Sequence, residues 1–212
     1  RDVGWVVGHS YIVYGPLLTG ATTVLFEGKP IGTPDPGTFW RVMNRHGVKT
    51  FFTAPTAIRA VRKEDPEANF LKEIGTGDCR VIFLAGERAD PDTIAWLEEK
   101  SGLPVIDHWW QTELGWPAIA TCFALGDLRR KRGSAGFPVP GYEFAVLDEG
   151  GEPVPHGQSG AVAIKAPLAP GAFRTLWNNP AGFEKNFATF PGWDETGDAG
   201  HFDEEGFLNI MG

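Results

Sequence analysis

The sequence contains few cysteines and no long apolar run. Its two cysteines, Cys79 and Cys122, stand far apart, and neither has a second cysteine or histidine at metal-ligand spacing. We therefore expect no disulfide framework and no zinc site, and a reducing intracellular setting fits best. The apolar stretch at residues 5–18 is interrupted by polar residues, glycine and proline, and it falls short of the ~20 residues that a membrane helix needs. We expect a soluble protein with no membrane partner.

Positive charge is also scarce. The chain has 19 basic and 27 acidic residues, a formal net charge of -8, and its Lys and Arg residues are scattered. No basic stripe is available to neutralise a phosphate backbone, so nucleic acid is not an expected partner. The one basic cluster, at residues 129–132, is typical of a solvated loop.

Aromatic residues, in contrast, are abundant. Eight Trp and fifteen Phe provide enough surface for a packed core, although 28 Gly and 17 Pro indicate many loops. The chain begins without Met inside an apolar run and ends after the strand-like residues 207–210, which predicts that both ends are cuts through a longer protein. The expected location is the cytoplasm, or the mitochondrial matrix in a eukaryote.

The first part of the sequence alternates between two periodicities. Apolar and β-branched runs predict strands at residues 21–27, 48–54, 80–85 and 105–108. Helical spacing separates them at residues 35–46, at 55–63, and from Asp90, a potential N-cap before Pro91, to Gly102. Strands joined by helical crossovers predict a largely parallel sheet.

After Trp116 the pattern changes to strands alone. Residues 142–147 and 159–165 alternate around the turn-rich stretch 148–152, and a final hairpin is predicted to turn at 203–206. The predicted fold class is therefore α/β: a largely parallel sheet with crossover helices in residues 1–125, followed by an antiparallel β-rich part in residues 126–212. The boundary is expected within residues 125–141, where charge, Gly and Pro concentrate.

Two polar clusters follow predicted parallel strands. The first is Gly86-Glu87-Arg88 and the second is residues 107–113, DHWWQTE. Ligands collect at the carboxyl ends of such strands, where glycine lets a flat ring or a phosphate approach the backbone. In the second cluster the Trp rings suit a base, Thr112 a phosphate and Glu113 a magnesium ion. A structural turn is the better explanation of the first cluster alone. For the second cluster, a nucleotide site and a turn whose Trp rings fill the core are equally good explanations.

Two further clusters are weaker on their own. Asp198 follows Gly197 and could accept hydrogen bonds from both ribose hydroxyls, although most Asp residues in this context form Asx turns. Residues 53–57, TAPTA, are small enough to leave room for a ligand, but they also suit a tight strand-to-helix turn.

Three segments together resemble one family. Residues 2–11 (DVGWVVGHSY), 53–59 (TAPTAIR) and 109–113 (WWQTE) closely resemble the acetyl- and propionyl-CoA synthetases of the adenylate-forming superfamily, in order and spacing over essentially the whole chain. Gly192-Trp193 followed by Thr196-Gly197-Asp198 resembles the aspartate motif of that superfamily. Residues 115–117, GWP, are more similar to the propionyl branch than to the acetyl branch.

The resemblance implies an AMP-forming acid-thiol ligase. A short carboxylate, propionate or acetate, would react with ATP to give acyl-AMP and pyrophosphate, and coenzyme A would then displace AMP, with Mg²⁺ assisting. The chain would be part of the large domain of such an enzyme and would end before the hinge and the small C-terminal domain. Its own missing N- and C-terminal parts are then its expected partners, beside the small-molecule substrates.

The resemblance also implies roles for individual residues. Thr112 would hold the α-phosphate, Glu113 would bind Mg²⁺, and these two are the expected catalytic residues. Ala54 would line the passage for coenzyme A, and Trp110 would close the acyl pocket against long acids. The nucleotide-binding residues would be Gly86, Glu87, Arg88, Asp107, His108, Trp109, Gln111, Thr112, Asp198 and Ile210, and the acyl pocket would be formed by Val6, Val7, Ala85 and Trp110.

Some residues depart from the family pattern. Leu114 replaces the usual Thr or Ser, Arg88 the usual Pro, and Asp194 a common aromatic residue. The phosphate loop and the C-terminal catalytic Lys of the family are not in this chain, so the chain alone is expected to be inactive. Two alternatives stay open: a ligase for a different carboxylate, against which Trp110 argues, and a non-catalytic nucleotide-binding or structural module.

Overall fold

A computed structural model describes residues 4–211, which form two compact units. The first unit runs through Asp107 and the second begins at His108, within a strand. Asp2 and Val3, part of the first family-like segment, lie outside the described residues.

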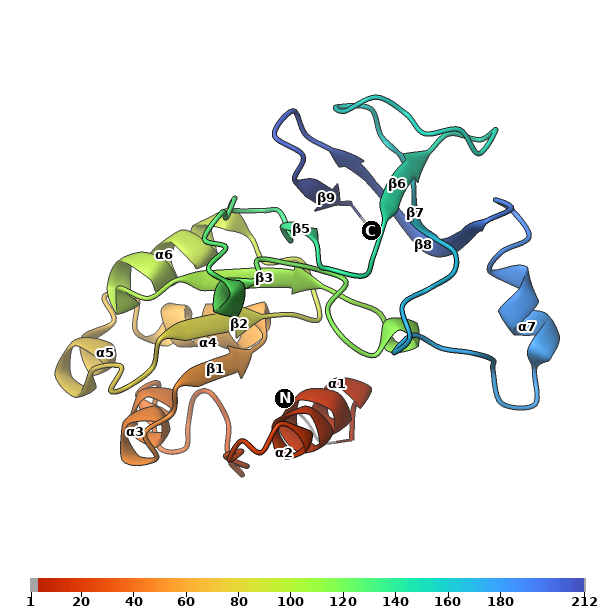
Figure 1. Ribbon diagram of the computed structural model, residues 1–212. Coiled ribbons are helices and arrows are strands. Elements are labelled where there is room, and N and C mark those ends of the chain that lie inside the picture. Colours follow the sequence, from red (N-terminus) through yellow and green to blue (C-terminus); the bar gives the residue numbers. More distant parts are fainter. Residues whose placement is uncertain (1–3, 212) are drawn as a thin grey trace. The chain divides into compact units, whose positions relative to one another are not determined.

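The first unit is built on parallel strands. β1 (Thr50–Thr53) pairs with β2 (Val81–Leu84), and β2 pairs with the start of β3 (Val105–Trp109). Helices separate the strands along the chain, as predicted, and lie beside them in Figure 1. These helices are α3 (Thr38–Arg45), α4 (Pro55–Glu64), α5 (Asn69–Ile74) and α6 (Pro91–Ser101), preceded by α1 (Val6–Gly8), a π-helix η1 (His9–Tyr14) and α2 (Gly15–Leu18).

The predicted signals at both ends of α6 are confirmed. The Asp90 side chain accepts a hydrogen bond from the Thr93 N–H, and Gly102 ends the helix in the left-handed conformation with φ of 68°. Ile94 and Leu97 face inward, where they join the core of the unit. The largest fully buried side chains of that core are Trp40, Met43, Ile58, Ile82, Leu84 and Leu97.

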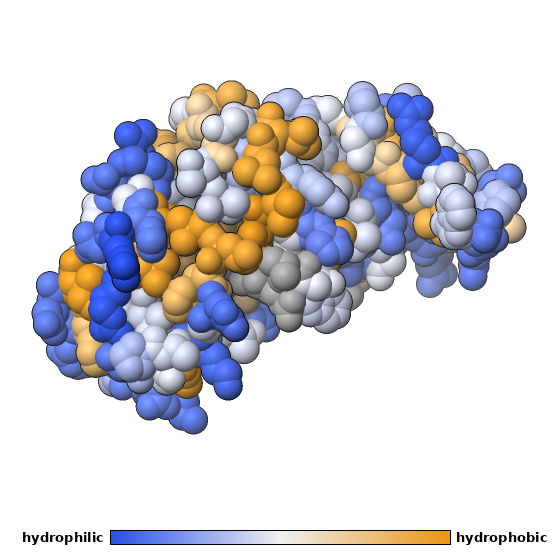
Figure 2. Space-filling view, turned by 90° about the horizontal axis from the view of Figure 1, so that it is seen from below, coloured by the Kyte–Doolittle hydropathy of each residue, from blue (hydrophilic) through white to orange (hydrophobic). Residues whose placement is uncertain are grey.

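The predicted strand at residues 21–27 is wrong. The segment has no regular secondary structure, and Leu25 is 69% exposed. A β-branched run forms a strand only where a neighbour satisfies its backbone groups, and within residues 4–211 no strand pairs with this segment. Figure 2 shows apolar side chains on the face of the molecule that carries this segment and α2.

The sequence pattern does not predict helix α5. It has only six residues, and its start depends on Ala68 in the left-handed conformation with φ of 53°. The carboxylate of Asp65 accepts hydrogen bonds from the N–H groups of Asn69 and Phe70 at 2.8 and 2.9 Å. This cap lies outside the helix, so the apolar pattern alone does not reveal it.

The second unit is dominated by antiparallel pairing. The end of β3 pairs with β4 (Ile119–Ala120), which pairs with β5 (Phe137–Pro138), so that β1 to β5 form one mixed sheet of five strands. Beyond Gly141 the predicted antiparallel sheet and its final hairpin are confirmed. Its strands are β6 (Phe144–Leu147), β7 (Gly160–Lys165), β8 (Trp193–Phe202) and β9 (Leu208–Ile210), accompanied by α7 (Pro180–Lys185) and the 3-10 helices η2 (Thr112–Leu114) and η3 (Phe123–Leu125).

Several expectations from composition can be checked in the described chain. None of its helices combines the length and apolar character needed to cross a bilayer. Both cysteines are free, and Cys79 is buried. In the basic cluster, Arg129 pairs with Asp127, and Lys131 pairs with Asp203 and Glu205, whose hydrogen bonds raise the pKa of Lys131 to about 12.

Candidate active site

The candidate residues of the first unit lie at the carboxyl ends of adjacent parallel strands. Thr53, the last residue of β1, is in register with Leu84, the last residue of β2, and Leu84 is in register with Asp107 of β3. The Ala85 N–H donates to the Thr53 carbonyl at 3.3 Å, which keeps the chains together one residue beyond the strands. Ala54 and Ala85 are therefore neighbours at this edge of the sheet, and both have small side chains.

A tight turn follows β2. Ala85 and Ala89 are fully buried, whereas Gly86, Glu87 and Arg88 between them are exposed. Gly86 has φ of 95°, a backbone conformation that favours glycine. The turn thus presents an exposed backbone anchored by a buried alanine on each side.

The helical segment at residues 6–18 contributes two further candidates. Val7 of α1 is buried and Val6 is half-buried. In η1, the ring of Tyr11 stacks on Phe52 of β1 with centroids 5.0 Å apart, which places this segment beside the strand that leads to Ala54. Trp110, the remaining candidate for the acyl pocket, belongs to the second unit and directly follows β3.

In the second unit, Trp109 and Asp198 are in direct contact although 89 residues separate them. The indole N–H of Trp109 donates to Asp198 Oδ2 at 3.0 Å, and the Trp109 ring makes an edge contact with Phe144 at 5.8 Å. Asp198 is half-buried, and within residues 4–211 no hydrogen bond reaches its Oδ1. One carboxylate oxygen is therefore available to accept a hydrogen bond from a ligand.

A second set of hydrogen bonds holds the same region. The Gln111 amide donates to the Thr196 carbonyl at 2.6 Å, and the Thr196 hydroxyl donates to the Val162 carbonyl at 2.7 Å. The Asp198 N–H donates back to Thr196 Oγ1 at 3.2 Å, across Gly197 with φ of 77°. These bonds fix Asp198 relative to Gln111, so the predicted second and third clusters meet in one place.

The 3-10 helix η2 presents Thr112 and Glu113 outward. Leu114 is fully buried in the core of the unit, and the Glu113 carbonyl accepts a hydrogen bond from the Phe173 N–H at 2.7 Å. Leu114 therefore anchors the helix, which accounts for an apolar residue at this position. Thr112 is exposed and Glu113 is half-buried.

Glu113 has the chemistry of a magnesium ligand. In the described chain its carboxylate oxygens accept no hydrogen bond, and no group of three or more His, Cys, Asp or Glu residues forms a closed metal site. Mg²⁺ commonly binds one or two carboxylates and completes its shell with substrate phosphates and water. A single open carboxylate beside Thr112 fits that mode of binding.

Asp194 is an unexpected buried carboxylate. It is 2% exposed, lies opposite Ile164 in the sheet, and its Oδ1 has no hydrogen-bond partner in the part of the chain that the structure describes. Burial raises the pKa of Asp194 to about 6; a hydrogen bond with Asn186 lowers it and the charge of Glu113 raises it further. Asp194 thus responds to the charge of the candidate magnesium ligand.

The remaining candidates are placed as follows. His108 is buried in β3 and pairs with Ala120, so its position is set by the sheet. Ile210 ends β9 opposite Gly200 and packs partly against the core of the second unit. Asp194, Thr196 and Arg59 were not among the candidate residues, because their contacts are with residues distant in the sequence.

Comparison with known proteins identifies the class to which this fold and these residues belong. The family model of AMP-binding enzymes matches residues 2–177, and the chain belongs to that family. It is 50% identical over 99% of its length to the mitochondrial acyl-CoA synthetase short-chain family member 3 of Mus musculus. It is 42% identical over its whole length to the propionate-CoA ligase of Salmonella typhimurium.

A solved structure supports the same relationship. The chain matches the crystal structure of an acyl-CoA synthetase from Brucella canis with a TM-score of 0.84 and 32% identity over 100% of its length. The chain covers 31% of the mouse protein, 34% of the Salmonella protein and 37% of the Brucella chain. It therefore spans about a third of the length of these relatives. The resemblance noted in the sequence and the predicted fold class are confirmed.

Proposed function

We propose that the full-length protein activates a short carboxylic acid with ATP and transfers the acyl group to coenzyme A. The observation that carries the proposal is the Trp109–Asp198 hydrogen bond, which holds one oxygen of Asp198 and leaves the other open for a ribose hydroxyl. A carboxylate is the strongest acceptor for such a hydroxyl. The names of the mouse and Salmonella relatives support the same activity.

The nucleotide would be bound by the residues that follow β2 and β3 and by Asp198 of β8. In this proposal Gly86, Glu87 and Arg88 line the adenine, with Asp107 and Trp109 at its edges, and Asp198 binds the ribose near Gln111. His108 and Ile210 support these from β3 and β9. The fixed turn after β2 and the Gln111–Thr196 hydrogen bond support the assignment, because both hold the binding groups in place before a ligand arrives.

Thr112 and Glu113 would act on the phosphates. In the first step a substrate carboxylate oxygen attacks the α-phosphorus, the bond to the β-phosphate oxygen breaks, and pyrophosphate leaves. Thr112 would donate its hydroxyl hydrogen to an α-phosphate oxygen. Glu113 would hold Mg²⁺, which when bound supplies positive charge for the phosphate oxygens. In the second step the thiol of coenzyme A loses its proton and its sulfur attacks the acyl carbon; the bond from that carbon to the phosphate oxygen breaks, and AMP leaves.

The acyl group would lie in a short pocket. Val6, Val7, Ala85 and Trp110 would line it, and Ala54 would border the path of the thiol. The small residues at the ends of β1 and β2 support this assignment. A bulky indole at Trp110 favours propionate or acetate over longer acids. The proposed location is the cytoplasm or, as for the mouse relative, the mitochondrion.

Propionate-dependent exchange of pyrophosphate into ATP tests the proposal. The full-length protein and the 212-residue chain are assayed side by side with propionate, acetate and an amino-acid mixture. We expect exchange by the full-length protein with propionate or acetate, and none by the chain alone, because the family's phosphate loop and catalytic Lys lie outside it. If the full-length protein catalyses no exchange with any acid, the proposed activity is wrong.

A further inference from the structure

Helix α4 begins without a cap of its own. Its N-cap residue Ala54 has no side-chain acceptor, and Pro55 at the first position has no N–H. The N–H of Thr56 instead donates at 2.7 Å to Oε1 of Glu87, 31 residues further along the chain, and the Thr56 hydroxyl contacts the same oxygen. Glu87 therefore caps α4 from the turn that follows β2.

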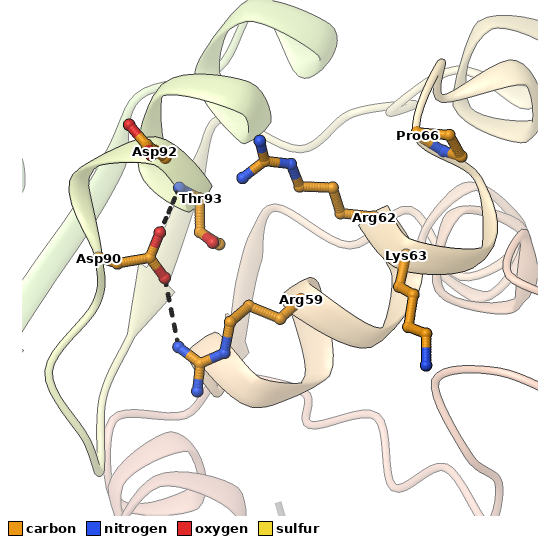
Figure 3. Close-up of a pocket in the computed structure, with 7 residues that line it drawn as sticks. All are labelled: Arg59, Arg62, Lys63, Pro66, Asp90, Asp92 and Thr93. Atoms are coloured by element: carbon orange, nitrogen blue, oxygen red, sulfur yellow. Dashed lines mark hydrogen bonds and ion pairs between the residues drawn. The ribbon is translucent and has the colours of Figure 1, made fainter.

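One arginine joins this cap to the next one. Arg59, one turn into α4, donates from Nη2 to Glu87 Oε2 at 2.8 Å and from Nη1 to Asp90 Oδ2 at 3.3 Å. The other oxygen of Asp90 accepts the Thr93 N–H and caps α6. Figure 3 shows the guanidinium of Arg59 pointing to Asp90, and Asp90 bonded in turn to Thr93. We call Arg59, Glu87 and Asp90 together the cap clamp.

The cap clamp holds the turn after β2 from outside. Ala85 and Ala89 are buried at either end of the turn, and the side chains of Glu87 and Asp90 are attached to α4 through Arg59. Burial lowers the pKa of Arg59, but hydrogen bonds and charges of Glu87 and Asp90 outweigh this and raise it overall. Because the Glu87 carboxylate is bonded to α4, the backbone of the turn and the Arg88 side chain remain for contact with a ligand.

We propose that Arg59 is a positioning residue, which fixes the backbone of the turn Gly86–Arg88 for the adenine of ATP through Glu87 and Asp90. The inference rests on the proposed function, because the turn is the predicted adenine side of the site. It assigns to Glu87 a role through the backbone rather than through contact with the nucleotide. It also links the adenine turn to Ala54, the residue that precedes α4.

The exposure of the ion pairs argues against a purely structural role. The side chains of Arg59 and Glu87 are 41% and 36% exposed, and ion pairs at this level of exposure contribute little to global stability. Loss of Arg59 is therefore expected to change the local order of the turn more than the melting temperature of the protein.

The neighbouring Arg62 provides a matched control. Arg59 and Arg62 lie on successive turns of α4 and line the same open groove of about 460 Å³, which the first turn of α6 borders (Figure 3). Unlike Arg59, Arg62 forms no ion pair with the residues that the structure describes. A general effect of positive charge in the groove would appear in both positions, whereas the cap clamp involves Arg59 alone.

The test uses the full-length protein with R59M, R59K and R62M. We expect R59M to raise the KM for ATP about tenfold while the KM for the acid and kcat change less than twofold, and R62M to match wild type. R59K keeps the charge but lacks the planar guanidinium whose two nitrogens reach Glu87 and Asp90 in fixed directions, so it should resemble R59M. In an E87Q background, R59M should have a smaller effect than in wild type, because the two residues act as a unit.

Two measurements do not require turnover. Hydrogen exchange of the amides at residues 86–89 should accelerate in R59M but not in R62M. The affinity for ATP, measured by calorimetry, should fall in R59M but not in R62M. If hydrogen exchange at residues 86–89 is unchanged in R59M, the cap clamp does not hold the turn. If hydrogen exchange is faster but the affinity for ATP is unchanged, Arg59 does not position the turn for ATP. Equal effects of R59M and R62M, or full rescue by R59K, would also overturn the positioning role. If wild type lacks the proposed ligase activity, these binding and exchange measurements still decide the inference.

Discussion

At the scale of single residues, two carboxylates on β8 illustrate how surroundings determine chemistry. Asp198 is half-buried, accepts one indole hydrogen bond and has an oxygen free for a ligand. Asp194 on the same strand is buried with an unsatisfied oxygen. Removing a carboxylate from water without full hydrogen bonding disfavours its charged form. The first residue therefore suits binding, and the second lowers stability when it is ionised.

Replacement of Asp194 by Asn should change how stability depends on pH. The native pKa is about 6 and the unfolded value 3.8, so between these values the native state binds more protons than the unfolded state. The free energy of unfolding therefore falls as pH rises through this window. Above pH 6 the ionised Asp194 lowers it by the full amount, about 3 kcal/mol. We expect D194N to melt at a higher temperature than wild type at pH 7.5 and to differ little at pH 3.5, below both pKa values.

Thermal melts of the full-length protein across this range test the expectation. E195Q, at the next position along β8, serves as the control because Glu195 is not buried. If wild type and D194N show parallel melting curves at every pH, Asp194 does not titrate in the native state as described.

Trp110 is the residue from which a short substrate was inferred. Replacing it by Gly removes the indole that would close the acyl pocket, so W110G should shift the preference from propionate toward longer acids such as octanoate. Each additional buried methylene contributes about 1 kcal/mol, so the change over several carbons should exceed tenfold in kcat/KM. Adenylation measured over a series of acids gives the result, and an unchanged preference would remove Trp110 from the pocket.

At the scale of elements, α6 shows which signals are local. Its cap at Asp90, its first-turn proline and its terminal Gly102 all lie within the helix or next to it, and all were predicted from the sequence. Residues 21–27 show the opposite case. They have strand propensity, but the described chain offers no partner strand, and propensity alone does not satisfy backbone groups.

Gly102 should contribute to stability only because it can adopt the left-handed conformation that ends α6. A Cβ added there meets nothing within 4 Å, but φ of 68° is strained for an L-residue with a side chain. We expect G102A to lower the free energy of unfolding by about 1 kcal/mol and G102N to lower it less, since Asn tolerates this conformation better. Urea unfolding followed by Trp fluorescence measures both, and equal stability of G102A and wild type would contradict the assignment.

At the scale of the whole molecule, the chain exposes several large apolar side chains. Leu17, Leu18 and Leu25 are 59%, 85% and 69% exposed, and they lie close together in the sequence. Figure 2 shows apolar side chains on the face seen from below in Figure 1, where α2 lies. Contiguous apolar patches favour association with other surfaces. The relatives, about three times as long, contain further chain that this sequence does not include.

The isolated 212-residue chain should therefore self-associate through this segment. We expect its apparent mass in light scattering to rise with concentration, and the double variant L17Q/L18Q to reduce that rise because less apolar surface is exposed. Leu125 and Leu128, 75% and 61% exposed in a loop of the second unit, provide a control pair. If L125Q/L128Q reduces association as much as L17Q/L18Q, the patch is not its cause.

The sequence by itself determined the family, the fold class and most elements of this protein. Motifs such as WWQTE, the caps of α6 and the alternating runs of β6 and β7 each depend on residues a few positions apart. The tertiary structure alone decided the Trp109–Asp198 contact across 89 residues, the cap clamp across 28 to 31 residues, and the burial that raises the Asp194 pKa. Local geometry follows from neighbours in the chain, whereas desolvation and ion pairing depend on which distant groups pack together.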